Sequence, residues 1–230
     1  MSVRQKVPED LTARKALALE VIDRLKKEYP DAGCTLDYAH AWQLLVSVRL
    51  AAQCTDARVN IVVEDLFAKY PSVAALAAAE PEDIEAIVKP CGLGHSKARD
   101  ISACMRMLRD KYDCQVPATF EELLALPGVG RKSANLIMGD VFGKPAIVTD
   151  THCIRLCNKI GLVDGIKEPQ KVEMALWKII PPEEGSDLCH RFVMHGRAVC
   201  NARKPECEHC CLKTICRYAQ EQSDTQTAGS

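Results

Sequence analysis

Residues 124–152 read LALPGVGRKSANLIMGDVFGKPAIVTDTH: Gly128 and Gly130 flank a valine, Lys132 follows closely, and Asp150 lies eighteen positions after that lysine. We expect a short helix over 119–126, a sharp turn at Pro127-Gly128-Val129-Gly130, and a second helix over 131–142 that begins at Arg131. Glycine permits positive φ and leaves backbone amides uncovered. The first N–H groups of a helix suit an anion such as phosphate. A bare GxG more often marks an ordinary helix corner, but the full string LPGVGRKSA favours a clamp that holds a nucleic-acid backbone without reading its sequence.

Lys132 lies in the first turn of this second helix. The positive end of the helix dipole disfavours another positive charge there, which favours the neutral amine. A neutral lysine amine is a nucleophile that attacks carbonyl-type carbons to form a Schiff base. A lysine that only binds phosphate is the commoner alternative.

The carboxylate that could act with Lys132 is chosen by distance along the chain. Asp140 lies eight residues further along the same helix, roughly 12 Å away at about 1.5 Å per residue, which is too far. Asp150 follows the turn Gly143-Lys144-Pro145 and an apolar return, over which the chain can come back to the start of the helix. Asp150 is also the expected N-cap of a helix over 151–160, which keeps its carboxylate ionised. Capping alone is the alternative role, and the two roles are compatible.

The chain has 13 cysteines among its 230 residues, and four of them follow a C-x6-C-x2-C-x5-C pattern: Cys200, Cys207, Cys210 and Cys216. Four thiolates on one compact loop are typical of a metal centre. Spacing alone leaves zinc and a [4Fe–4S] cluster open, with His209 and Cys211 as alternative ligands. Residues 189–217 hold six Lys or Arg and two Glu. A four-cysteine [4Fe–4S] centre carries a net charge of about −2. The local positive charge of this segment is suited to offset it and to face DNA phosphates.

Composition limits the remaining possibilities. The formal net charge of −1 means that the whole-chain charge does not predict nucleic-acid binding. We expect no signal peptide. The sequence also contains no run of about 18 apolar residues, the length that a membrane-spanning helix needs. We therefore expect an intracellular, reducing compartment, in which clustered cysteines bind metal more often than they form disulfides. The polar residues 221–230 predict a disordered tail.

Apolar residues recur at helical spacing between proline and glycine breaks, and no alternating β-branched run argues for a sheet. The sequence therefore predicts an all-α chain with a sizeable core, since 47% of the residues are hydrophobic. The expected helices cover 12–29, 40–52, 56–69, 73–79, 82–89, 96–112, 119–126, 131–142, 151–160, 170–180 and 186–199.

The sequence resembles the endonuclease III family of helix-hairpin-helix DNA glycosylases. The resemblance covers roughly residues 12–218 and rests on LPGVGRKSAN, VTDTHCIRLCNKIG, HGRAVC and the cysteine spacing. It implies a six-helix barrel domain over 34–145 that carries the hairpin, and an iron–sulfur cluster domain built from 1–33 and 146–220, with DNA across the groove between them. It also implies that the four cysteines bind a [4Fe–4S] cluster and not zinc.

The resemblance implies roles for individual residues as well. Lys132 matches the family's Schiff-base lysine and Asp150 its essential aspartate. A glycosylase must take the damaged nucleotide out of the stack; Gln53 matches the residue that fills the vacated space, and Leu93 matches the wedge on the opposite strand. From sequence alone these two would be a helix-end polar residue and an apolar turn residue. Further DNA contacts are implied for Gly128, Gly130, Arg131 and His152, with Asp56 beside the pocket.

The activity implied is that of a bifunctional DNA glycosylase/AP lyase of base excision repair, which removes oxidised pyrimidines and cuts the strand 3′ to the abasic site by β-elimination. The implied partner is double-stranded DNA with damaged bases or abasic sites, bound by a monomer in a bacterial-type cytoplasm at the nucleoid. Arg49 and Ala51 replace the family's usual apolar residue and serine, so the preferred damaged bases stay open.

Two other functions are considered. A monofunctional or mismatch-type glycosylase of the same superfamily would commonly lack the lysine. A non-catalytic or redox-sensing iron–sulfur DNA-binding protein would need no pair of Lys132 and Asp150. The sequence predicts neither protein partners nor a redox role for the cluster.

Overall fold

The computed structural model describes residues 11–227. In that range the chain forms helices, short 3₁₀ turns and loops, and no β-strand. The all-α prediction is therefore confirmed. The chain divides into two compact units, and we call Cys34–Lys144 the central unit and the described residues on either side of it the terminal unit. Within 11–227, no helix has the length and apolar character that crossing a bilayer requires.

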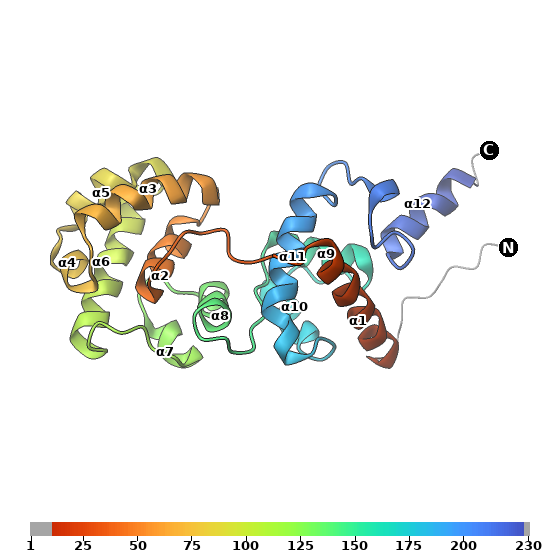
Figure 1. The fold of residues 1–230 in the computed structure, drawn as a ribbon, viewed down its shortest axis with the longest axis horizontal. Helices are drawn as coiled ribbons and strands as arrows, with labels where there is room; N and C mark the ends of the chain where they lie inside the picture. Colours follow the sequence, from red (N-terminus) through yellow and green to blue (C-terminus); the bar gives the residue numbers. More distant parts are fainter. Residues whose placement is uncertain (1–10, 228–230) are drawn as a thin grey trace. The chain divides into compact units, whose positions relative to one another are not determined.

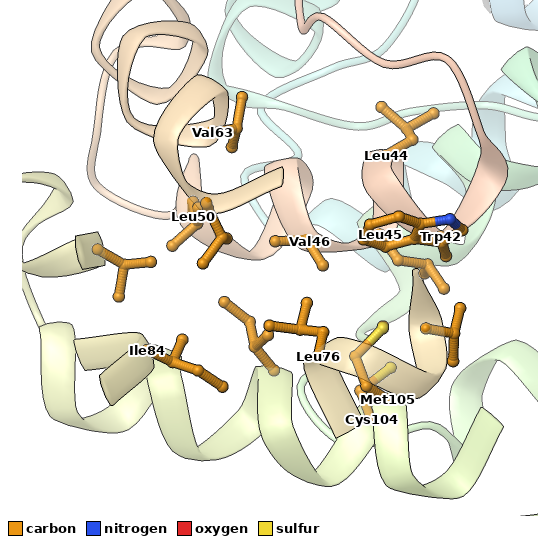
Figure 2. Close-up of a cluster of buried hydrophobic side chains, with 14 of the residues drawn as sticks. Trp42, Leu44, Leu45, Val46, Leu50, Val63, Leu76, Ile84, Cys104 and Met105 are labelled. Carbon is orange, nitrogen blue, oxygen red and sulfur yellow. The ribbon is translucent and has the colours of Figure 1, made fainter. Parts of the chain in front are cut away.

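The central unit contains seven α-helices and one 3₁₀ turn within its bounds: α2 (Ala41–Leu50), α3 (Asp56–Lys69), α4 (Val73–Ala78), α5 (Pro81–Val88), η1 (Lys89–Cys91), α6 (Gly94–Lys111), α7 (Phe120–Ala125) and α8 (Arg131–Asp140). Helix α6 packs against α4 and α5, and α2 packs against α3, α6 and α8 (Figure 1). Figure 2 shows Val46 and Leu50 of α2 opposite Leu76, Ile84 and Met105. This apolar core fixes the helices from which the hairpin and its neighbouring turns project.

Local signals explain where several of these helices begin. The side chain of Thr55 accepts a hydrogen bond from the Arg58 N–H at 3.3 Å, and that of Ser72 accepts one from Ala75 at 3.1 Å. Pro81 opens α5 at its first turn, where no intrahelical partner for an N–H is lost. Short side chains and proline thus set the starts of α3, α4 and α5.

The terminal unit joins the N-terminal helix to the C-terminal part of the chain. Its elements are α1 (Leu11–Glu28), α9 (Thr151–Ile160), α10 (Pro169–Leu176), η2 (Pro182–Glu184), α11 (Gly185–Ala198), η3 (Cys207–His209) and α12 (Arg217–Thr227). Helix α11 packs against α1 and α9, and α12 packs against α9. The Asp164 carboxylate pairs with Arg14 of α1 and Arg217 of α12. The two ends of the described chain therefore meet at one carboxylate.

A glycine lets α9 and α11 approach closely. A Cβ atom at Gly196 would collide with the His152 ring and would lie 2.9 Å from the Arg155 guanidinium. The glycine of HGRAVC is thus a packing requirement of this unit.

Several helix ends differ from those expected: α8 ends at Asp140 and not at 142, and α10 ends at Leu176 and not at 180. Two further differences concern the start of α6 and the C-terminal tail. Helix α6 begins at Gly94 and not at Ser96, because Leu93 in a left-handed conformation precedes it as N-cap. Helix α12 reaches Thr227, so the disordered tail expected over 221–230 is not seen in 221–227; residues 228–230 lie outside the described range. Ala219 is buried and the Lys159 ammonium lies 4.0 Å from the Tyr218 ring centroid, and these contacts anchor the start of α12.

Candidate active site and metal centre

The hairpin between α7 and α8 is tightly turned around Gly128. This glycine has φ +75°, and a Cβ atom there would lie 2.9 Å from the Asp100 side chain and 3.1 Å from Arg49 Cδ. The Val129 N–H closes the turn by donating to the Leu126 carbonyl at 3.2 Å. Gly128 is therefore required both by the backbone conformation and by the packing beneath it.

Gly130 differs from Gly128 because the protein itself does not require a glycine there. Its φ of −100° and ψ of 178° are extended, and a Cβ atom would meet no atom within 4 Å. Gly130 is the N-cap of α8, and α8 begins at Arg131 as predicted. No N-cap side chain bonds to the first amides of the helix, and amides at this position can donate to an outside acceptor. The absent side chain keeps that approach open, as an anion such as a phosphate requires.

Two cations flank these amides. The Arg131 guanidinium lies 4.9 Å from the Phe120 ring centroid, which ties the start of α8 to α7. Lys132 follows in the first turn of α8 and its side chain is exposed. The structure thus brings Gly128, Gly130, Arg131 and Lys132 together at one turn of the central unit.

Asp150 is the N-cap of α9 in the terminal unit. Its Oδ1 accepts a hydrogen bond from the Cys153 N–H at 2.7 Å, so the capping prediction is confirmed. His152 follows in the first turn, and its Nδ1 accepts a hydrogen bond from Arg155 at 3.2 Å. The predicted catalytic lysine and aspartate therefore lie at the starts of two consecutive helices, one in each unit.

Gln53 and Leu93 share an unusual backbone conformation. Gln53 has φ +57° and Leu93 has φ +50°, a region that non-glycine residues rarely adopt. Both side chains are exposed, and Leu93 keeps 57% of its surface accessible. Such backbone strain is typical of functional turns. Sequence reasoning did not detect this conformation, because neither residue is a glycine or an asparagine.

The four spaced cysteines lie in the segment between α11 and α12. All four are free thiols, with Cys200 after α11, Cys207 in η3, Cys210 directly after η3, and Cys216 before α12. Burial raises the pKa of Cys216 to about 11 and raises that of Cys200, where Lys159 and Arg155 oppose the shift. A buried thiol of this kind becomes a thiolate ligand when a metal supplies positive charge.

His195, from HGRAVC, is a residue of this centre for which the sequence predicted no role. It is 1% exposed, its Nε2 lies 3.3 Å from Cys210 Sγ, and its Nδ1 lies 3.0 Å from the Tyr29 hydroxyl. A thiolate at Cys210 would accept a hydrogen bond from the Nε2–H of His195, while Nδ1 accepts one from the Tyr29 hydroxyl. Only the folded structure brings Tyr29 next to this pair, since it lies 166 residues away in sequence.

The donor set fits an iron–sulfur cluster. Zinc requires its four donors at about 2.0–2.3 Å from one point. The four thiolates of a [4Fe–4S] cluster bind four separate iron atoms. Four free cysteines on one segment supply the thiols that such a cluster needs.

The class of protein follows from comparison with known families. Residues 46–182 match the model of the HhH-GPD superfamily of base excision DNA repair proteins. This range contains the hairpin, Lys132 and Asp150. The fold and the hairpin thus define a helix-hairpin-helix base excision repair protein.

Individual relatives narrow this class. The chain is 43% identical to endonuclease III of Synechocystis over 91% of this chain and 96% of the relative. It is 37% identical to endonuclease III of Escherichia coli K12, over 90% and 98% of the two chains. A solved structure of a trapped endonuclease III–DNA covalent intermediate aligns with a TM-score of 0.86 and 40% identity, over 91% of this chain and 98% of the other. The chain belongs to the endonuclease III family.

Proposed function

We propose that this protein is a bifunctional DNA glycosylase/AP lyase that removes oxidised pyrimidines and cuts the strand 3′ to the abasic site. The observation that carries the proposal is the exposed Lys132 in the first turn of α8, directly after a glycine hairpin with open amides. Similarity to a trapped covalent complex of endonuclease III with DNA supports a covalent step. A helix-hairpin-helix protein without catalysis would not need a nucleophile at this position.

The chemistry begins when the Lys132 amine attacks C1′ of the damaged nucleotide. The glycosidic C–N bond breaks, its electron pair leaves with the base, and the base takes up a proton. The Asp150 carboxylate, oriented by the Cys153 N–H, assists the proton transfers and stabilises the positive charge that develops on the sugar. The sugar ring then opens to give a Schiff base between C1′ and the lysine nitrogen.

Strand cleavage proceeds from this Schiff base. The iminium acidifies C2′, and loss of a C2′ proton forms a double bond to C3′ as the C3′–O bond breaks. The phosphate leaves with the electron pair of that bond, and hydrolysis of the imine returns free Lys132. Every step uses groups of this chain, the DNA and water.

Access to C1′ requires that the damaged nucleotide leave the duplex. We assign Gln53 to the space that it vacates and Leu93 to a wedge against the opposite strand. Their exposed side chains on strained turns support these roles. We also assign Arg131 and the hairpin amides to contacts with phosphates, and His152 and Asp56 to contacts with the extruded nucleotide. The substrate is double-stranded DNA, bound by a monomer in the bacterial cytoplasm at the nucleoid.

We assign Cys200, Cys207, Cys210 and Cys216 as the ligands of a [4Fe–4S] cluster. When bound, the cluster fixes the fold of residues 200–216 and presents their basic side chains to DNA, and it supplies no reacting group. The positive side chains of Arg155 and Lys159 near Cys200 support a site that holds several thiolates.

The proposal is tested with a duplex that contains one oxidised pyrimidine, such as thymine glycol. Wild-type protein is expected to release the base and nick the strand. Lys132→Ala is expected to lose nicking, while Lys111→Ala, an exposed lysine at the end of α6, serves as the matched control. Asp150→Asn is expected to slow turnover with DNA binding largely kept. Wild-type protein that binds abasic DNA but never cuts it would leave only the non-catalytic function.

A further inference from the structure

Lys97 is a charged side chain in the interior of the central unit. It is 0% exposed, and its Nζ donates to the Leu50 carbonyl at 2.8 Å and to the Cys91 carbonyl at 2.8 Å. Burial lowers the pKa of this ammonium, while the Cys91 and Cys54 thiols oppose the shift. A buried ammonium is costly unless its hydrogen bonds are made, and the two carbonyls supply such bonds to Lys97.

Each of the two carbonyls lies just before a strained turn. Leu50 is the last residue of α2, three residues before Gln53, and Cys91 is the last residue of η1, two residues before Leu93. The last carbonyls of a helix have no intrahelical partner. Lys97 therefore satisfies one such carbonyl at the end of each element and joins the starts of the two turns through a single nitrogen atom.

The same two turns also influence each other electrostatically. The thiol of Cys54, which follows Gln53, adds to the effect of burial in raising the pKa of Cys91. Leu93 is also the N-cap of α6, the helix that carries Lys97. The backbones that hold Gln53 and Leu93 are thus tied at their bases while their side chains stay exposed.

We propose that Lys97 is a positioning residue for nucleotide extrusion, which fixes the turns of Gln53 and Leu93 relative to one another. This inference rests on the proposed function, since it needs the DNA-inserting roles of those two side chains. A filler and a wedge that act on one base pair must keep their spacing. A misplacement of about 1 Å can cost on the order of 100-fold in rate.

The test compares Lys97→Met, which keeps the chain length and apolar contacts but has no donor, with Lys111→Met on the same helix. Each variant is assayed on two substrates. One is a duplex with an oxidised pyrimidine, whose removal requires extrusion. The other is a single-stranded oligonucleotide with a preformed abasic site, which has no stacked base to displace and no opposite strand to wedge. Unstacking is followed directly by the fluorescence of 2-aminopurine placed opposite the lesion.

Lys97→Met is expected to lower the single-turnover rate on the duplex by about 10- to 100-fold. The 2-aminopurine fluorescence that reports unstacking should fall together with this rate. Cleavage of the single-stranded abasic site should be largely kept. Its effect should also be much smaller in a Leu93→Ala background, because both changes then act on the same step. Lys111→Met should match wild type in both assays.

Three results would overturn the inference. Unchanged duplex cleavage would remove Lys97 from extrusion. Parallel loss of both activities, including loss through unfolding, would make it a general structural residue. If the effects of Lys97→Met and Leu93→Ala on the duplex rate add fully, Lys97 does not act through the Leu93 wedge. If Gln53→Ala and Leu93→Ala themselves leave duplex cleavage unchanged, the roles assigned to those residues fail, whatever Lys97→Met does.

Discussion

At the scale of single residues, the two hairpin glycines have different roles. Gly128 serves the fold, and Gly130 serves the contact with DNA that we propose. Gly128 has positive φ and packs on Arg49 and Asp100, whereas Gly130 is extended and faces open space. A methyl group at Gly128 would disturb the protein. A methyl group at Gly130 would disturb only something that approaches from outside.

We predict that Gly130→Ala keeps its melting temperature close to that of wild type but binds abasic DNA about 10- to 100-fold more weakly. The reason is that a hydrogen bond to a charged phosphate contributes about 1.5–3 kcal/mol. Gly128→Ala should instead lower the free energy of unfolding by about 1–3 kcal/mol through strain and steric contact. Urea unfolding and fluorescence anisotropy measure the two effects. Equal DNA affinity of Gly130→Ala and wild type would show that no phosphate approaches this amide cradle.

How far the sequence predicts the site depends on the range of each interaction. The turn at the hairpin glycines and the Asp150 cap depend on neighbours a few residues away, so turn and capping rules found them. The packing of Gly128 on Arg49 and Asp100 was not predicted. The Lys97 bond to Leu50 spans 47 residues and the contact between Tyr29 and His195 spans 166, and no local pattern encodes these pairs. The positive φ of Gln53 and Leu93 was not predicted either, because the surrounding packing holds those turns.

At the scale of helices, the site is supported by a link between α2 and α6. The Arg49 guanidinium contacts the Asp100 carboxylate through Nε at 2.8 Å and through a terminal nitrogen at 2.7 Å, and it donates to Ser96 Oγ at 3.2 Å. The two side chains are 20% and 27% exposed and lie directly under Gly128. This ion pair, in which both Arg49 nitrogens contact Oδ2 of Asp100, connects the helix that leads to Gln53 with the helix that begins after Leu93.

We predict that Arg49→Leu lowers the free energy of unfolding by about 1–3 kcal/mol, because it leaves the Asp100 carboxylate partly buried without its cation. The double variant Arg49→Leu/Asp100→Asn should recover most of that loss. Urea denaturation of the single and double variants completes the cycle. Additive losses would contradict a coupling between these two side chains.

Helix prediction also succeeded where the signal lies in nearby residues and failed where contacts between distant residues decide. Most helices of both units were expected from apolar spacing and proline breaks, and the start of α8 at Arg131 was predicted. The start of α6 was placed two residues late because a left-handed leucine is not a recognisable N-cap. The helix α12 was missed because its composition is polar, and its start is anchored by contacts of Tyr218 and Ala219 rather than by its own pattern.

At the scale of the whole molecule, charge is distributed unevenly. The chain as a whole carries −1, yet residues 189–217 hold six Lys or Arg and two Glu. The cysteines that we assign to the cluster lie in this segment, which has only the 3₁₀ turn η3 between α11 and α12. Because regular helix covers little of this segment, we expect its fold to depend on the group that the thiolates bind.

We predict that removal of iron opens residues 200–216 to proteases, while the helices of the central unit keep their circular dichroism signal. Binding to abasic DNA should weaken by about 10-fold or more, and the salt dependence of binding should become shallower because fewer phosphate contacts remain. Limited proteolysis with mass spectrometry and anisotropy titrations at several salt concentrations follow both effects. Iron-free protein that binds abasic DNA as tightly as the loaded protein would contradict this role.

The central claim is that the Lys132 amine forms the covalent bond to DNA. The most direct measurement is to trap wild-type protein on abasic DNA with borohydride, digest the complex and locate the modified residue by mass spectrometry. We predict that the sugar remnant is found on the peptide containing Lys132, and that Lys132→Ala binds the same DNA without forming an adduct. A remnant on another amine, or an adduct that persists in Lys132→Ala, would contradict the account.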